Sequence, residues 1–221
     1  MDGRLQIRVK KAERFSFYSH LIGTAASIIG LVVLLSITWG QWDYLIVSLV
    51  YGVGVICLFS ASSLYHNFKQ KENDVSIWRK LDHVAIFIMI AGTYTPIAYI
   101  YLDGVWFWSI IGIQWACVVL GLFFKLFYLR APRVISPILY MIMGWMAVIP
   151  ILILWQEMPR LSFILMAAGG ATYSIGAVIY AIKKPDPFPG IFGFHEIFHI
   201  FILGGVVLHY FMVYSVIIVK L

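Results

Sequence analysis

Two histidines near the end of the chain, His195 and His199, have the spacing of paired metal ligands. Residues 193–199 read GFHEIFH. On an α-helix, residues four apart lie about 40° apart around the axis and about one turn apart along it, so both imidazoles can face one point. They open a long apolar segment, and imidazoles inside a membrane are costly to leave without a partner. A bound metal ion would satisfy both rings, provided that other segments supply ligands at the same depth.

The rest of the chain has the composition of a membrane protein with several spans. It is 62% hydrophobic and 12% charged, whereas about a quarter of the residues of a soluble protein are charged. Several apolar runs reach the roughly 20 residues that cross a bilayer as a helix. We therefore predict an all-α integral membrane protein, a seven-transmembrane helix bundle that forms one domain over residues 1–221. The expected helices cover about residues 17–38, 44–67, 81–101, 105–128, 134–155, 161–182 and 191–219.

The positive charges predict the orientation of this bundle. The net charge is +6, and fourteen of the sixteen Lys and Arg residues fall in the N-terminal segment and in the second, fourth and sixth loops. Only Arg160 and Lys220 fall on the other side. The positive-inside rule then places the N-terminus in the cytoplasm and the C-terminus outside. Because the cations flank apolar spans, they indicate a membrane and not a nucleic acid. Cys57 and Cys117 lie inside apolar runs and do not suggest a disulfide framework.

This topology brings further polar side chains to the level of the histidine pair. The second helix ends at the cytoplasmic face with Ser62 and His66, and the third helix begins there with Asp82. The seventh helix also begins there, with His195 and His199 one or two turns inside. Three helices that are far apart in the sequence therefore carry ligand-type residues to one depth, where polar groups are rare.

This set of residues is typical of a catalytic zinc site. Three neutral imidazoles, here His66, His195 and His199, leave a fourth position of Zn²⁺ open for an oxygen ligand or water. Asp82 could bind the ion directly, or hold a zinc-bound water and accept its proton. Ser62, one turn before His66 on the same face, could orient a ligand or donate to a reacting oxyanion.

The remaining polar candidates in the spans have weaker claims. Residues 195–199 match H-E-x-x-H, in which the glutamate is a general base, but without the setting of a soluble zinc protease. Glu196 therefore ranks behind Asp82. His83 points about 100° away from Asp82 and is expected to be a neighbour only. His209 is roughly 15 Å deeper than His199 and is expected to be packed in the core. His20 could either support the metal site or simply pack.

At these residues the chain resembles the hemolysin III family, the bacterial relatives of the progestin and adipoQ receptors, which include the adiponectin receptors. The resemblance extends over essentially the whole chain. It rests on Glu13 with Ser19-His20-Leu21 and Gly23, where Ser16 replaces a usual Asn, on Ser62 with Leu64-Tyr65-His66, on Leu81-Asp82-His83, on residues 92–96 (GTYTP), and on His195 with His199.

The resemblance implies a multi-pass protein of the bacterial cell membrane with a zinc ion on the cytoplasmic side. His66, His195 and His199 would hold the metal, and Asp82 would lie beside a metal-bound water. It also implies a metal-dependent hydrolase, since ceramidase-like activity is proposed for the receptors. The leading hypothesis is thus a zinc-dependent hydrolase of a lipid amide or ester, with a membrane lipid as substrate. Two alternatives remain open: a pore-forming hemolysin, and a non-catalytic regulator of membrane lipids with structural zinc.

Overall fold

The computed structural model describes residues 9–70, 75–128 and 135–221, and within these residues the fold is all-helical, as predicted. Between Phe188 and Phe192 there is one isolated bridge, and the described ranges contain no strand. The α-helices are α1 (Arg14–Ile37), α2 (Trp42–Phe68), α3 (Ile77–Tyr101), α4 (Gly104–Phe127), α5 (Ile135–Gly144), α6 (Ile151–Glu157), α7 (Arg160–Ile182) and α8 (Phe194–Lys220). Two short 3₁₀ segments, η1 (Lys11–Glu13) and η2 (Trp145–Val148), precede α1 and follow α5.

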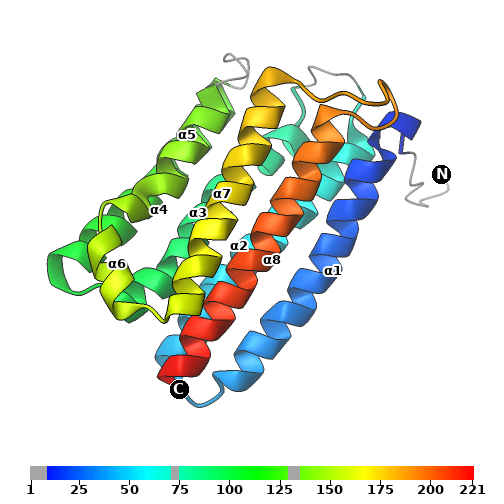
Figure 1. Ribbon diagram of the computed structural model, residues 1–221. Helices are drawn as coiled ribbons and strands as arrows, with labels where there is room; N and C mark the ends of the chain where they lie inside the picture. The colour runs from blue at the N-terminus through cyan, green and yellow to red at the C-terminus, as the bar shows by residue number, and fades with distance from the viewer. Residues whose placement is uncertain (1–8, 71–74, 129–134) are drawn as a thin grey trace.

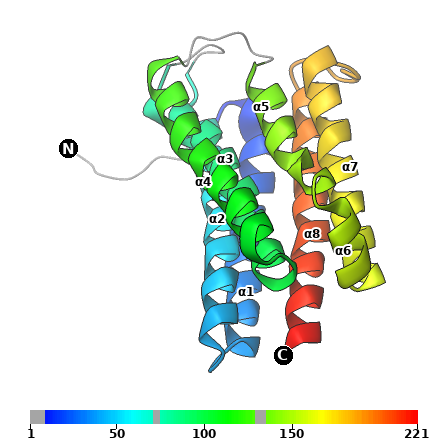
Figure 2. The same cartoon turned by 90° about the vertical axis from the view of Figure 1, so that its left-hand side faces the viewer.

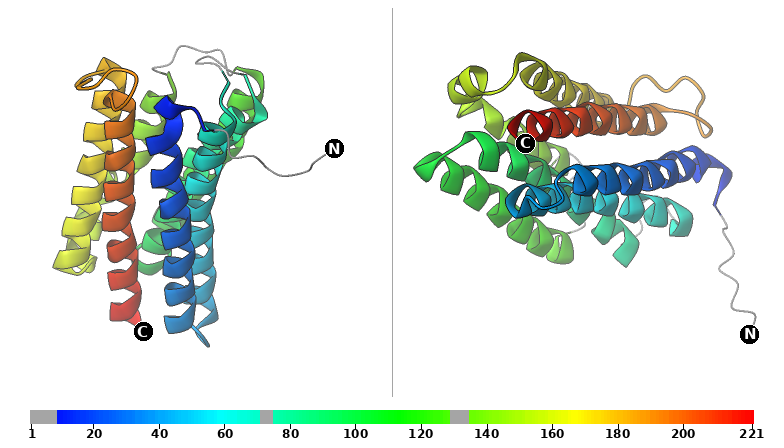
Figure 3. Two further views of the ribbon diagram at one scale, coloured as in Figure 1. Left: turned by 90° about the vertical axis from the view of Figure 1, so that its right-hand side faces the viewer. Right: turned by 90° about the horizontal axis from the view of Figure 1, so that it is seen from below.

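The long helices lie side by side in one bundle (Figure 1, Figure 2). α2 packs against both α1 and α3, α3 also packs against α4, and α7 pairs with α8. α8 in turn lies against α1 and α3, which brings the last helix of the chain next to the first (Figure 3). The start of α8 therefore comes close to the start of α1 and to the end of α2, the three segments that carry most of the candidate residues.

Among the described residues, six helical segments are long and apolar enough to cross a membrane, with η1 and α1 counted together. The seventh is broken, because α5 with η2 meets α6 at a bend of 54°. The prediction of one continuous helix over about 134–155 is therefore wrong, and its first residue lies outside the described ranges. The break falls at Pro150, which has no N–H to continue the helical ladder. α1 begins and α8 ends at opposite ends of the bundle (Figure 1). This requires an odd number of crossings between them, so we count the bent pair as one.

The last helix begins later than expected, at Phe194 and not at about residue 191. The amide of Phe188 donates to the carbonyl oxygen of Phe192 at 3.0 Å, which holds this stretch in a turn. Gly193 is then extended and forms the N-cap. His195 consequently lies in the first turn of α8, at the very end of the bundle.

Two glycines allow α2 and α3 to approach backbone to backbone. A Cβ on Gly54 would lie 3.3 Å from the carbonyl oxygen of Ile88, and a Cβ on Gly92 would lie 3.2 Å from that of Val50. Small residues at helix contacts are the usual means of close association in membranes. This contact aligns the end of α2, which carries His66, with the start of α3.

We expect Gly92→Leu to force α2 and α3 apart and to destabilise the protein by about 1–3 kcal/mol, the usual cost of overpacking. The measurement is the thermal unfolding temperature of the purified protein in detergent. Gly112→Leu on α4 is the matched control, because a Cβ there would meet no atom within 4 Å. Equal unfolding temperatures for the two variants would contradict the close contact.

The orientation of the bundle can also be tested. Of the described Lys and Arg residues, those of the N-terminal segment and of the even-numbered loops lie at the end where α8 begins, opposite Arg160 and Lys220. We expect this end to be cytoplasmic. Alkaline phosphatase fused after Leu221 should then be active and green fluorescent protein dark, with the reverse result for fusions after Lys184. A fluorescent C-terminal fusion would contradict the orientation.

Candidate metal centre

Three histidines from two helices meet at this end of the bundle. His66 is in the last turn of α2, and His195 and His199 are in the first two turns of α8. One ring nitrogen of each lies within 4.8 Å of the other two. His66 and His199 are each 2% exposed, and His195 is partly buried. The structure thus brings together the three residues that the sequence suggested as metal ligands.

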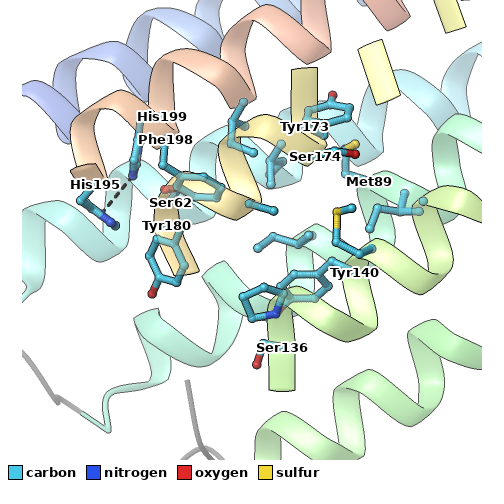
Figure 4. A pocket seen from close by; sticks show the side chains of 18 of the residues that line it. Ser62, Met89, Ser136, Tyr140, Tyr173, Ser174, Tyr180, His195, Phe198 and His199 are labelled. Atoms are coloured by element: carbon cyan, nitrogen blue, oxygen red, sulfur yellow. Dashed lines mark hydrogen bonds between the residues drawn. The ribbon is translucent and has the colours of Figure 1, made fainter. Parts of the chain in front are cut away.

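The spacing of these nitrogens suits a small divalent cation. Nε2 of His195 and Nε2 of His199 are 3.2 Å apart (dashed in Figure 4). In a tetrahedral zinc site with Zn–N bonds of about 2.0–2.1 Å, two ligand nitrogens lie roughly 3.3 Å apart. The ring of His66 lies 5.3 Å and 4.9 Å, centroid to centroid, from the rings of His195 and His199. The cluster can therefore accept a metal without large movements of its side chains.

Glu13 fixes the orientation of His66, and this role was missed in the sequence. Its Oε2 lies 2.7 Å from Nδ1 of His66, while its Oε1 accepts a hydrogen bond of 2.7 Å from Nζ of Lys69. A carboxylate behind a histidine commonly fixes the tautomer that turns the other nitrogen to a metal. Nε2 of His66 is thereby left for the cluster. The sequence marked Glu13 only as part of the family opening, since no spacing rule links residues 53 positions apart.

Asp82 and Ser62 lie beside the cluster. The N-cap Ser76 accepts a hydrogen bond from the amide of Arg79 and starts α3 one residue later, which places Asp82 in its second turn. Ser62 and Asp82 line the same cavity as the three histidines. Asp82 is not in the group of atoms that meet within 4.8 Å. Asp82 is therefore a neighbour of the three grouped histidines and not a member of their group.

Both carboxylate oxygens of Glu196 have polar neighbours at the start of α8 and on α1. Its Oε2 accepts the amide N–H of Gly193 at 2.8 Å, and its Oε1 lies 3.5 Å from the hydroxyl of Ser16. A glutamate three residues after the N-cap often satisfies an otherwise unpaired amide in this way. The carboxylate is thus turned to the start of α8 and to α1. This agrees with its lower rank as a base.

The other histidines of the spans are outside the group of candidate ligands. Nε2 of His209 lies 3.2 Å from the carbonyl oxygen of Met166, as expected for a packed histidine. His83, whose carbonyl oxygen accepts the hydroxyl of Tyr140, is not one of the grouped ligands. His20 is 3% exposed, and its ring lies 4.0 Å, centroid to centroid, from that of His199.

A cavity of about 720 Å³ extends from the cluster into the bundle. Figure 4 shows His195 and His199 at one side of it, with Met89 and Tyr173 farther along. The polar part of the wall includes Ser62, Asp82 and the three histidines. The apolar part comes from α3, the broken helix, α7 and α8, and includes Met89, Ile90, Ile97, Ile151, Phe163, Met166 and Ile202. The cavity thus joins a polar head to an apolar interior.

Comparisons with known proteins agree with the motifs and the fold. The profile of the family described as "Haemolysin-III related" matches residues 9–210. The chain is 34% identical to "Hemolysin-3" of Bacillus cereus over 92% of its length and 90% of that protein. It is 35% identical to the "Hemolysin-3 homolog" of Bacillus subtilis (strain 168) over 88% of its length and 89% of that protein. A more distant relative is the "Adiponectin receptor protein" of Drosophila melanogaster, 30% identical over 72% of this chain and 39% of that protein. Because this family profile covers almost the whole chain, the protein belongs to the haemolysin-III related family.

Proposed function

We propose that this protein is a zinc-dependent membrane hydrolase that cleaves a lipid amide or ester. The observation that carries the proposal is the meeting of three histidine nitrogens at the polar head of a cavity whose interior is apolar. A membrane lipid has the same division, with a polar linkage next to long hydrocarbon chains. The cavity could therefore hold the chain while the linkage lies at the cluster.

The donor set supports zinc as the bound metal. All three candidate ligands are imidazoles, and the second nitrogen of His66 is held by a carboxylate, as is common in zinc sites. Three protein ligands leave one position open, which distinguishes catalytic from structural zinc sites. When bound, zinc supplies Lewis acidity that polarises a carbonyl oxygen and makes water a better nucleophile at neutral pH.

The neighbouring residues have the chemistry that such hydrolysis needs. Asp82 would accept a proton from the attacking water while the oxygen of that water bonds to the carbonyl carbon. Ser62 can donate its hydroxyl to the negative charge that develops on the carbonyl oxygen. As the C–N or C–O bond breaks, Asp82 returns its proton to the leaving amine or alcohol. The products are a fatty acid and that amine or alcohol.

The cavity supports a substrate with one long chain. Its volume of about 720 Å³ lies within the range of about 300–1,000 Å³ that is usual for small-molecule sites. His209, which lines the same cavity, is ten residues beyond His199 on α8, and a helix rises about 1.5 Å per residue. The cavity thus extends roughly 15 Å from the cluster along the bundle, a length suited to an extended acyl chain.

We place this activity in the cytoplasmic leaflet of a bacterial plasma membrane. The Bacillus relatives support the bacterial membrane, and the positive charges at the metal end support the cytoplasmic side. The substrate would enter as a lipid of that leaflet, with its headgroup region level with His195.

A second candidate function is pore formation, which the name "Hemolysin-3" of the Bacillus cereus relative favours. Purified protein would then lyse erythrocytes, and His195→Ala would lyse them equally well. Loss of lysis together with loss of metal would instead link any lytic effect to the metal centre. A regulator with structural zinc would bind the metal and show no turnover.

We expect the purified protein to bind about one zinc ion per chain, measured by elemental analysis after exhaustive dialysis. The combined variant His66→Ala/His195→Ala/His199→Ala should bind none, because it removes all three donors. His209→Ala is the matched control, since it removes a buried histidine of the same helix that lies outside the cluster. Full metal retention in the triple variant would rule the site out.

We expect Asp82→Asn to reduce the release of fatty acid from ceramide-type and ester lipids by about 10²–10⁴-fold, the usual contribution of a general base. Bound zinc should remain within twofold of the wild type, because Asp82 stands outside the ligand group. Asp103→Asn, an exposed carboxylate between α3 and α4, serves as the control. The proposed role fails if Asp82→Asn retains full turnover, or if it loses its metal.

A further inference from the structure

We infer that His20 of α1 positions the ligand His199 by pairing with the ring nitrogen that His199 turns away from the metal. The inference rests on the proposed metal centre and adds a residue that acts through a ligand and not on the substrate. The three candidate ligands differ in the partner of their second ring nitrogen, the one that does not face the cluster. This difference points to His20.

A ligand histidine binds the metal through one nitrogen and normally gives the N–H of the other to a neighbouring acceptor. For His66 that neighbour is Glu13, at 2.7 Å. His195 is only partly buried, so other partners can reach it. His199 is 2% exposed, and its Nδ1 is buried with no hydrogen-bond partner among the described residues. One buried ligand therefore lacks the support that the other has.

His20 of α1 is in contact with the ring of His199. Its ring lies 4.0 Å from that of His199, centroid to centroid, at an interplanar angle of 35°. Both of its ring nitrogens are themselves buried without a partner among the described residues. Three unpaired nitrogens on two touching rings are thus shut away from water. A hydrogen bond from Nδ1–H of His199 to a nitrogen of His20 would require the rings to turn from this face-to-face contact toward an edge-to-edge one, because an N–H points along the plane of its ring.

The geometry separates this role from that of a fourth ligand. Nε2 of His199 faces Nε2 of His195 at 3.2 Å, so Nδ1 lies on the opposite edge of the ring from Nε2 and outside the cluster. His20 is not in the group of nitrogens that meet within 4.8 Å. It is therefore outside the group of candidate ligands, and the fourth position of the metal would stay open.

The surroundings of His20 limit where its ring can go. Phe59 of α2 packs edge-on against it, with ring centroids 5.1 Å apart. Gly23, one turn later on α1, gives Phe59 this room, because a Cβ there would lie 3.0 Å from the Phe59 ring. The ring of His20 thus packs between those of Phe59 and His199. Simple packing would need only an aromatic ring at this position, whereas positioning needs a hydrogen-bond acceptor for Nδ1–H of His199.

The test compares His20→Phe, which keeps a ring but has no nitrogen, with His20→Asn and His20→Gln, which each keep one polar group. The control is His209→Phe, a buried histidine of the same cavity outside the cluster. The full chain is purified in detergent, and its zinc affinity is measured by competition with a chelating dye. The absorption spectrum of the cobalt-loaded protein and the unfolding temperature of the metal-free protein are recorded in parallel.

We expect His20→Phe to weaken zinc binding by about 10–100-fold, the usual effect of losing a residue behind a ligand, and to change the cobalt spectrum. At least one of His20→Asn and His20→Gln should recover affinity, and His209→Phe should match the wild type. Wild-type affinity in His20→Phe would overturn the inference, as would equal loss in all three His20 variants. Absence of zinc from the wild type would instead overturn the metal centre itself, and the inference with it.

Discussion

A nitrogen of an imidazole that is buried in a membrane bundle is costly to leave without a partner, and this constraint governs the packing around the histidine cluster. His66 and His199 are almost fully buried, so their polar atoms cannot turn to water. An unpaired polar group in such surroundings is costly, so side chains next to His66 and His199 are expected to offer hydrogen-bond partners. The Glu13 carboxylate is the partner of Nδ1 of His66, and the Nε2 atoms of His195 and His199 pair with each other. Nδ1 of His199 and both ring nitrogens of His20 have no partner among the described residues.

The first helix is consequently more than a membrane anchor. η1 and α1 carry Glu13, Ser16 and His20, and these three face His66 of α2 and Glu196 and His199 of α8. α1 therefore joins the two helices that hold the candidate ligands. The packing of α8 against α1 brings the two ends of the sequence to the same point, so that a site could form from segments about 180 residues apart.

Much of this could be predicted from the sequence, because the signals are local or follow from topology. Apolar runs of bilayer length predict the helices, and the direction of each helix predicts that His66, Asp82 and His195 share one end. What escaped prediction depends on side-chain contacts between distant segments. Glu13 lies in a polar stretch where carboxylates are common, and nothing in its spacing points to His66. The expected helix over about 134–155 includes Pro150, because a single proline in an apolar run can either kink a helix or end it.

The distance of 3.2 Å between the two Nε2 atoms of His195 and His199 has a consequence for how the centre is filled. Two neutral imidazoles can share that contact only if one Nε2 carries a hydrogen and the other offers its lone pair. A cation needs a lone pair from both. Binding of a cation through both Nε2 atoms would therefore require the hydrogen of each ring to be on Nδ1. The tautomers of His195 and His199 would then be fixed together, and each Nδ1–H would need an acceptor of its own.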